Sequence, residues 1–183
     1  YGYLFYDEEF RKKKFERTAG ILIDELKKNP NNIYYRYQLS KRYRANRDKE
    51  NALIEIRKAY QLVTGDKELR KRYSYIYGSY ASCCYDCNEF EESIKACIEG
   101  LDTEPEYVDL YYLAAASHDA LGNRKAAIEW FKSFIEIADK FDQLAISKSQ
   151  STEMIFNGPN EMDTACLYIA NEAFDRQDYK TAY

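Results

Sequence analysis

The chain has 183 residues, of which 45% are hydrophobic and 32% charged, a balance that excludes a disordered acidic tail and a membrane protein. It contains only 7 glycines and 3 prolines, too few turn residues for a barrel or sandwich of short strands, so the composition favours long helices. The formal net charge of −4 argues against nucleic-acid binding, although a basic run, Arg11-Lys12-Lys13-Lys14, lies beside aromatic residues.

The charge is distributed unevenly along the chain. Residues 1–72 contain 19 Lys and Arg against 11 Asp and Glu, whereas residues 73–183 contain 8 against 20. Such a polarised molecule could steer a charged partner or associate head to tail. The alternative is that both halves are simply solvated surfaces, compensated by charges elsewhere in a larger protein.

Residues 7–28 form the first predicted helix. Its apolar side contains Phe10, Phe15, Ile21, Leu22 and Leu26. The acidic run Asp7-Glu8-Glu9 lies at its N-terminal end and Lys27-Lys28 at its C-terminal end, where each sign of charge is favoured by the helix dipole. The residues before it, 1–6, are strongly aromatic and are expected to pack against another part of a longer protein. The absence of an initiating Met supports the same interpretation, namely that the sequence is a fragment.

Small residues recur in pairs separated by twelve positions. The four pairs are Ser40/Ala52, Ala81/Ser93, Ala115/Ala127 and Ala170/Ala182. A large apolar residue lies within the three positions before the first member of each pair. In the first repeat the aromatic residue Tyr43 follows Ser40 by three positions. This spacing places all three on one face of a helix, so two antiparallel helices can approach closely at the small residues.

The pattern resembles the tetratricopeptide repeat, in which a 34-residue unit forms two helices. The step from Ala81 to Ala115 is 34 residues, whereas the step from Ser40 is 41 and the step to Ala170 is 55. We therefore expect seven inserted residues near Thr64–Arg72 and twenty-one between about 138 and 160. The predicted units are 1–32 (junction segment and leading helix), 33–66 (first repeat), 67–105 (insert and second repeat), 106–138 (third repeat), 139–162 (inserted loop) and 163–183 (partial fourth repeat).

The resemblance implies an all-α fold, a right-handed superhelix of antiparallel helix pairs with about three full repeats and partial units at both ends. The first helix of each pair would line a concave groove, rich in tyrosine, basic at one end and acidic at the other. Tyrosine provides rigid contact area with a polar tip, which suits an extended peptide, although tyrosine in this number could also serve helix packing. The predicted groove residues are Tyr34, Tyr37, Lys41, Arg44, Tyr75, Ser82, Tyr85, Asp86, Asp109, Tyr112, Asp119 and Asn171.

The sequence contains five cysteines, Cys83, Cys84, Cys87, Cys97 and Cys166, and shows no secretory-signal pattern. An odd number of cysteines without such a signal suggests a reducing, cytoplasmic compartment. Cys84-x-x-Cys87 has the spacing of a zinc site. No second such pair exists, and the single histidine is more than twenty residues beyond Cys97. We therefore interpret the cysteines as small packing residues rather than metal ligands.

No catalytic motif is present. The sequence lacks a glycine-rich phosphate loop, His-Glu-x-x-His, Gly-x-Ser-x-Gly and Asp-x-Asp, and its one histidine, His118, lies on the packing stripe. The clamp with which some tetratricopeptide domains hold a terminal carboxylate is also absent, because Tyr37 stands where that clamp has lysine and Lys41 where it has asparagine. The fragment is therefore expected to be non-catalytic and to need no cofactor or metal.

A second resemblance covers about residues 1–60. The residues that carry it are Tyr1-Gly2-Tyr3, Lys14-x-x-Arg17, Leu22, Leu26, Asn29-Pro30, Tyr35-x-x-x-Leu39 and Tyr43. They resemble the junction in bacterial family 2 glycosyltransferases between a sugar-transferring domain and a tetratricopeptide tail. The resemblance implies a parent enzyme that uses a nucleotide sugar and a divalent metal, with its catalytic residues upstream of this sequence.

We expect a protein–protein or peptide interaction module, the tail of such a glycosyltransferase, that positions a protein acceptor or partner. The alternative is a self-association module driven by the basic and acidic halves. The expected partners are a protein or peptide, the upstream catalytic domain or a second copy, with no nucleic acid. No apolar run approaches the ~18–20 residues of a membrane span.

Overall fold

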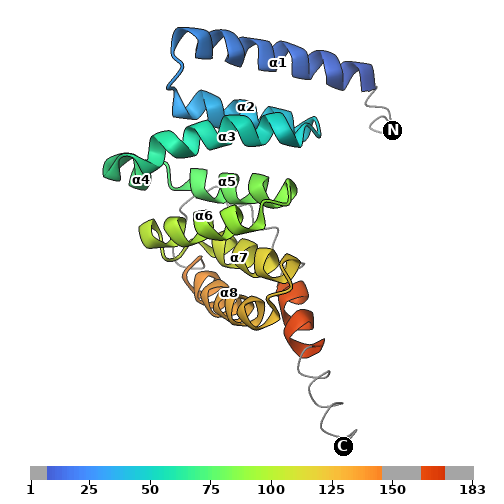
Figure 1. The fold of residues 1–183 in the computed structure, drawn as a ribbon, viewed down its shortest axis with the longest axis vertical. Helices are drawn as coiled ribbons and strands as arrows, with labels where there is room; N and C mark the ends of the chain where they lie inside the picture. Colours follow the sequence, from blue (N-terminus) through green and yellow to red (C-terminus); the bar gives the residue numbers. More distant parts are fainter. Residues whose placement is uncertain (1–7, 146–161, 172–183) are drawn as a thin grey trace, which may run out of the picture. The chain divides into compact units, whose positions relative to one another are not determined.

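The computed structural model describes residues 8–145 and 162–171, and within these ranges the chain consists of α-helices joined by short turns (Figure 1). The chain divides into two compact units, Tyr1–Asn88 and Glu89–Tyr183. Residues 162–171 form a further helix. The other helices are α1 (Glu8–Lys28), α2 (Ile33–Ala45), α3 (Lys49–Thr64), α4 (Lys67–Arg72), α5 (Tyr75–Asp86), α6 (Phe90–Thr103), α7 (Val108–Ala120) and α8 (Arg124–Ala145).

Helix α1 is the leading helix predicted from the sequence, and it packs along α2 (Figure 1). The contact is a small apolar core in which Ala19, Leu26 and Leu39 are buried. The ring of Phe15 lies 5.7 Å from that of Tyr43 at the edge of this core. Leu22 and Leu26 of the predicted apolar side therefore pack against α2. Ile21 is instead 60% exposed, because it lies on the side of α1 turned away from this core, so its assignment to the apolar side is wrong.

Helices α2 and α3 form an antiparallel pair joined by a turn at Asn46–Asp48. The side chain of Asp48 caps α3 by accepting a hydrogen bond from Asn51 N at 3.1 Å, and Arg47 takes a positive φ of 63°. The small pair predicted from the sequence lies at the contact, where Ser40 Oγ donates to the Ala52 carbonyl at 2.8 Å. Both residues are buried, so the slim side chains allow one helix backbone to lie directly against the other.

The predicted seven-residue insertion forms the six-residue helix α4. Asp66 caps it by accepting hydrogen bonds from Glu68 N and Leu69 N at 2.8 and 3.2 Å. Arg70 fastens it to the end of α3 by donating from Nε and Nη2 to the Thr64 carbonyl at 3.1 and 2.7 Å. None of the six residues is buried, so α4 contributes little to the core.

Helix α5 packs on α3 through a core of aliphatic and aromatic side chains. The rings of Tyr60 and Tyr80 stack at 4.2 Å, and Ile56 and Ile76 are fully buried. Arg57 Nε donates to Tyr80 Oη at 3.2 Å, which satisfies the phenol oxygen in this apolar setting. The tyrosines of α3 and α5 thus contribute to packing as well as to the surface.

In the second unit α7 packs against both α6 and α8. Ala115 and Ala127, a predicted small pair, are fully buried, and Phe134 fills the core beside them. The turn between α7 and α8 passes through Gly122 at φ 74°, a left-handed conformation that glycine adopts at little cost. Two of the four predicted small pairs are therefore placed as expected.

The remaining two pairs have different outcomes. Ala81 and Ser93 are each fully buried, but they belong to different units. Ala170 is exposed, whereas Ala165, five residues earlier, is fully buried in the core that α7 and α8 share. Five residues rotate a helix by about 140°, so the two alanines face opposite ways and the prediction that Ala170 is the packing residue is wrong. Its predicted partner Ala182 lies outside the described residues.

The long insertion predicted at 139–162 begins as helix. Helix α8 continues without a break to Ala145, seven residues beyond Ala138, the last residue of the predicted third repeat. Residues 146–161 and 172–183, which include most of the predicted loop and the second half of the predicted fourth repeat, lie outside the described residues.

We predict that enlarging the small residue at the α7–α8 contact destabilises the protein. Ala115→Leu should lower the free energy of unfolding by about 1–3 kcal/mol, because no space exists for extra methyl groups between closely packed helices. The control is Ala120→Leu on the same helix, where the side chain is exposed and the change should stay within about 0.5 kcal/mol. Urea unfolding followed by circular dichroism measures both, and equal effects would contradict the packing role.

Candidate binding surface

The first-helix surface of unit 1 is the exposed side of α2 and α5 that carries Tyr34, Lys41, Arg44, Tyr75 and Asp86. On α2, Tyr34 and Lys41 are seven residues apart and Lys41 and Arg44 three, so they form one stripe along the helix. Tyr34 is 50% exposed, and Lys41 and Arg44 are exposed as well. Tyr75 and Asp86 of α5 are half-buried beside them.

Two contacts join these helices, which are the first helices of consecutive repeats. At one end the rings of Tyr37 and Tyr75 lie 4.8 Å apart. At the other end Arg44 Nε donates to Asp86 Oδ2 at 2.7 Å. Lys49 of α3 adds a further hydrogen bond to the same residue, from its Nζ to the Asp86 carbonyl at 3.1 Å. The basic and acidic residues that the sequence placed in a groove are therefore partly neutralised by one another. The paired helices form a surface whose side chains are held in place before a ligand arrives.

A row of tyrosine rings leads from the buried Tyr37 to this surface. It consists of Tyr37, Tyr75 and Tyr73, with centroid separations of 4.8 and 6.0 Å. A cation lies over the ring at each end, because Lys41 Nζ is 5.2 Å from the Tyr37 centroid and the Arg72 guanidinium carbon is 5.4 Å from that of Tyr73. Such cation–π contacts hold a charge at the surface while its alkyl stem covers a ring.

Arg72 and Tyr73 are not among the groove residues predicted from the sequence. Both residues lie at the end of the inserted segment. The repeat pattern does not include that segment, so it assigns these residues no position in a groove. The signal that could have found them is local: the segment 67–75 reads Lys-Glu-Leu-Arg-Lys-Arg-Tyr-Ser-Tyr, a run of cations followed by aromatic residues at every second position.

The second unit shows a similar link between consecutive first helices. Tyr168 in the helix of residues 162–171 donates from Oη to Asp119 Oδ1 of α7 at 2.6 Å. Asp119 and Asn171, both predicted groove residues, are exposed. Tyr112 instead packs its ring on those of Phe131 and Phe134, so much of its surface serves the core.

Three other predicted groove residues are buried: the solvent-exposed fractions of Tyr37, Ser82 and Asp109 are 6%, 5% and 4%. They offer a partner little contact area, and Tyr37 acts as the inner end of the tyrosine row. Tyr85 is half-buried at the end of α5. The predicted residues that remain accessible in unit 1 are therefore those of the first-helix surface together with Tyr85.

The cysteines of α5 lie in the packed interior. Cys84 is fully buried, and Cys83 Sγ is 3.9 Å from Ser40 Oγ at the contact between α2 and α5. Burial raises the pKa of the Cys83 thiol to about 11, so at neutral pH it is a protonated packing group. Within residues 8–145 and 162–171 no three His, Cys, Asp or Glu side chains are grouped so that they could hold a metal ion.

His118, the sole histidine, lies near the end of α7 with Nδ1 buried. Removal from water lowers the pKa of its imidazole, because the protonated ring loses more solvation than the neutral one.

Among the described helices, none is both long enough and apolar enough to cross a bilayer.

No protein-family model and no curated protein matches the chain. Among solved structures, a crystal structure of MamA aligns over 100% of both chains, with 23% identity and a TM-score of 0.62. The TPR2B domain of yeast Sti1, solved in a complex with pHsp70, aligns over 76% of this chain and 97% of its own, with 15% identity and a TM-score of 0.57. A kinesin-light-chain type protein of Podospora anserina, with nearly identical TPR-like repeats, covers 92% of this chain and 86% of its own at 12% identity and a TM-score of 0.61.

These likenesses concern the fold. The chain has the tetratricopeptide-type arrangement of antiparallel helix pairs, and the predicted all-α fold class is confirmed. At 12–23% identity they do not extend to the chemistry of the surface.

We predict that Cys83 is alkylated much more slowly than Cys166 in the folded protein. The first thiol is buried and its pKa is raised to about 11, whereas the second is exposed. With iodoacetamide at pH 8, the rate at Cys83 should be lower by about tenfold or more, and it should rise steeply as the pH approaches 11. Mass spectrometry of tryptic peptides measures both rates. In guanidinium the two rates should converge, and equal rates in the folded protein would contradict the burial of Cys83.

Proposed function

We propose that the chain is a non-catalytic module that binds a protein or peptide partner on the first-helix surface of unit 1. The observation that carries this proposal is the combination of exposed Tyr34, Lys41 and half-buried Tyr75 on two helices that are already tied together. Side chains held in this way lose little conformational freedom on binding, so more of the contact energy appears as affinity. Tyrosine suits such a surface because one rigid side chain supplies both a large ring and a hydroxyl group.

The structural neighbours support a protein or peptide as the partner, since one of them, the TPR2B domain of yeast Sti1, is bound to pHsp70. The chemistry of the surface is consistent with this class of ligand. A peptide offers backbone groups for the tyrosine hydroxyls and side chains for the charged residues, and an extended peptide can follow the exposed side of a helix pair.

We predict that the double variant Tyr34→Ala with Lys41→Ala weakens peptide binding by about tenfold, the effect of losing two well-placed contacts. The ligands are peptides selected on the wild-type protein from a displayed random library. Their affinities are measured by fluorescence anisotropy at physiological ionic strength.

The matched control changes an exposed apolar residue and a lysine on α3. Ile54 is 45% exposed and the Lys58 side chain 47% exposed, so Ile54→Ala with Lys58→Ala removes comparable surface from the second helix of the same repeat. The control should alter affinity by less than about twofold. Equal losses in both variants, or a library from which no peptide is enriched, would contradict binding at this surface.

We further propose that the module is the tail of a cytoplasmic, bacterial family 2 glycosyltransferase. The support is the resemblance of residues 1–60, together with five free cysteines, which fit a reducing compartment. Several residues that carry the resemblance, including Leu22, Leu26 and Leu39, lie in the core between α1 and α2. An Asp-x-Asp motif in a βαβ pattern upstream in the reading frame would support this parent, and a different upstream domain would overturn it.

A second candidate function is self-association through opposite charges. The observation in its favour is that α2 contains four cations and no acidic residue, whereas α6 contains Glu91, Glu92, Glu99 and Asp102 against the single cation Lys95. Two copies could pair a basic unit 1 with an acidic unit 2.

If self-association occurs, it should depend on salt. Sedimentation velocity at 20 mM and 500 mM NaCl should show an oligomer that dissociates as the screening length falls from about 20 to about 4 Å. A monomer at both concentrations would rule out this second function.

A further inference from the structure

We propose that the inserted helix α4 and Tyr73 form a recognition element for an acidic segment of another protein, in which an aromatic side chain lies on the tyrosine row. This inference rests on the proposed function and names the chemistry of the partner. The insertion is where this chain departs from the 34-residue repeat, so its residues are the part of unit 1 that the repeat itself does not require.

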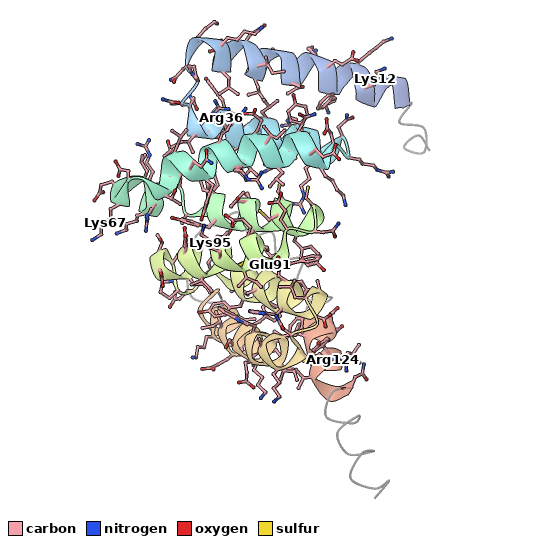
Figure 2. All side chains as sticks on the ribbon, in the orientation of Figure 1. Lys12, Arg36, Lys67, Glu91, Lys95 and Arg124 are labelled. Atoms are coloured by element: carbon pink, nitrogen blue, oxygen red, sulfur yellow. The ribbon has the colours of Figure 1, made fainter. Side chains whose placement is uncertain are left out.

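The core provides no reason for the composition of α4. None of its residues is buried, yet four of the six are cations and only one, Glu68, is acidic. Lys67, Lys71 and Arg72 are exposed, and Figure 2 shows Lys67 at the outer end of the helix. Like charges this close repel one another and reduce helix stability, so the cluster is explained better by a ligand of opposite charge than by the needs of folding.

The element is nevertheless held firmly in position. Asp66 caps its N-terminus, and the guanidinium of Arg70 grips the carbonyl of Thr64 with two hydrogen bonds. Arg70 is thereby turned toward α3, while the neighbouring Lys71 and Arg72 remain at the surface. Cations on a helix fixed in this way lose less conformational freedom when they bind a ligand, which favours a specific contact over non-specific electrostatic attraction.

The cations of α4 connect directly to the aromatic part of the surface. Arg72 lies over Tyr73, and Tyr73 contacts Tyr75, which contacts Tyr37 of α2. Tyr73 and Tyr75 are half-buried, so each retains accessible ring area. Alternate side chains of an extended peptide are about 6.6 Å apart, which is close to the 6.0 Å between these two rings. An extended segment can therefore place a flat side chain on the row while neighbouring carboxylates reach the cations.

An acidic protein segment fits these observations better than a nucleic acid. The exposed cations of α4 are separated from Lys41 of α2 by the tyrosine row, whereas a strand of phosphates needs a continuous basic track. The expected ligand thus carries several Asp or Glu residues next to Tyr or Phe.

The test uses the full chain and three soluble polymers: poly(Glu,Tyr), poly(Glu) and the oligonucleotide (dT)12. Binding is measured by anisotropy at 50 mM and 200 mM NaCl. Poly(Glu,Tyr) should bind with at least about fivefold higher affinity than poly(Glu), because aromatic contact adds to the charge term, and (dT)12 should bind more weakly than either. Tighter binding of (dT)12, or equal binding of the two polymers, overturns the proposal.

The decisive variant combines Lys67→Glu, Lys71→Glu and Arg72→Glu, which should weaken poly(Glu,Tyr) by about tenfold or more. Its matched control is Lys12→Glu, Lys13→Glu and Lys14→Glu on α1, which changes the net charge equally at three exposed residues (Figure 2). The control should weaken binding by less than about threefold, since only long-range attraction is altered. Equal losses in both variants would mean non-specific attraction and overturn the proposal.

The variant Tyr73→Phe keeps the ring and Tyr73→Ala removes it, so only Tyr73→Ala should reduce the preference for poly(Glu,Tyr) over poly(Glu). Unchanged preference in Tyr73→Ala overturns the aromatic part. The library-selected peptides separate this inference from the proposed function. If they lose affinity in Tyr34→Ala with Lys41→Ala but not in the α4 variant, the binding surface stands and the role of α4 falls.

Discussion

The structure depends on the close approach of antiparallel helices at small side chains. Ser40 lies against Ala52 in one unit and Ala115 is buried with Ala127 in the other, and larger residues fill the space on either side. Because helix backbones can meet only where side chains are slim, these positions fix which face of each helix points inward. The face that points outward is fixed by the same geometry, which is why Tyr34 and Lys41 reach the surface.

Much of this arrangement could be predicted from spacing alone. A spacing of twelve positions between small side chains, with a polar turn such as Asn46–Asp48 between them, indicates a helix pair. The longer step after Ser40 indicates an insertion in the segment where the structure has α4. Such patterns are informative because they repeat, so each pair supports the phase of the next. Spacing does not distinguish Ala170 from Ala165, because both are small residues of the same short helix, and Ala165 is the one that is buried.

The surface could be predicted less well than the fold. The phase of the repeat correctly placed Lys41 and Arg44 outside, but it could not show that Arg44 would pair with Asp86 forty-two residues later, because that contact depends on how two repeats meet. Nor could it assign Tyr73, which belongs to no repeat. Burial depends on neighbours from other helices, so Tyr37 and Asp109 were placed in a groove although they lie within the packed interior.

The position of α4 outside the core affects which amino-acid substitutions the protein can tolerate. None of the six residues of α4 is fully buried, Asp66 caps its N-terminus, and Arg70 donates hydrogen bonds to the Thr64 carbonyl of α3. Substitutions at Lys67, Lys71 and Arg72 are therefore expected to cost little stability, as at other surface positions away from caps and cores. The charge and binding preference of α4 can therefore change, in evolution or by protein engineering, while the packing of the other helices stays the same.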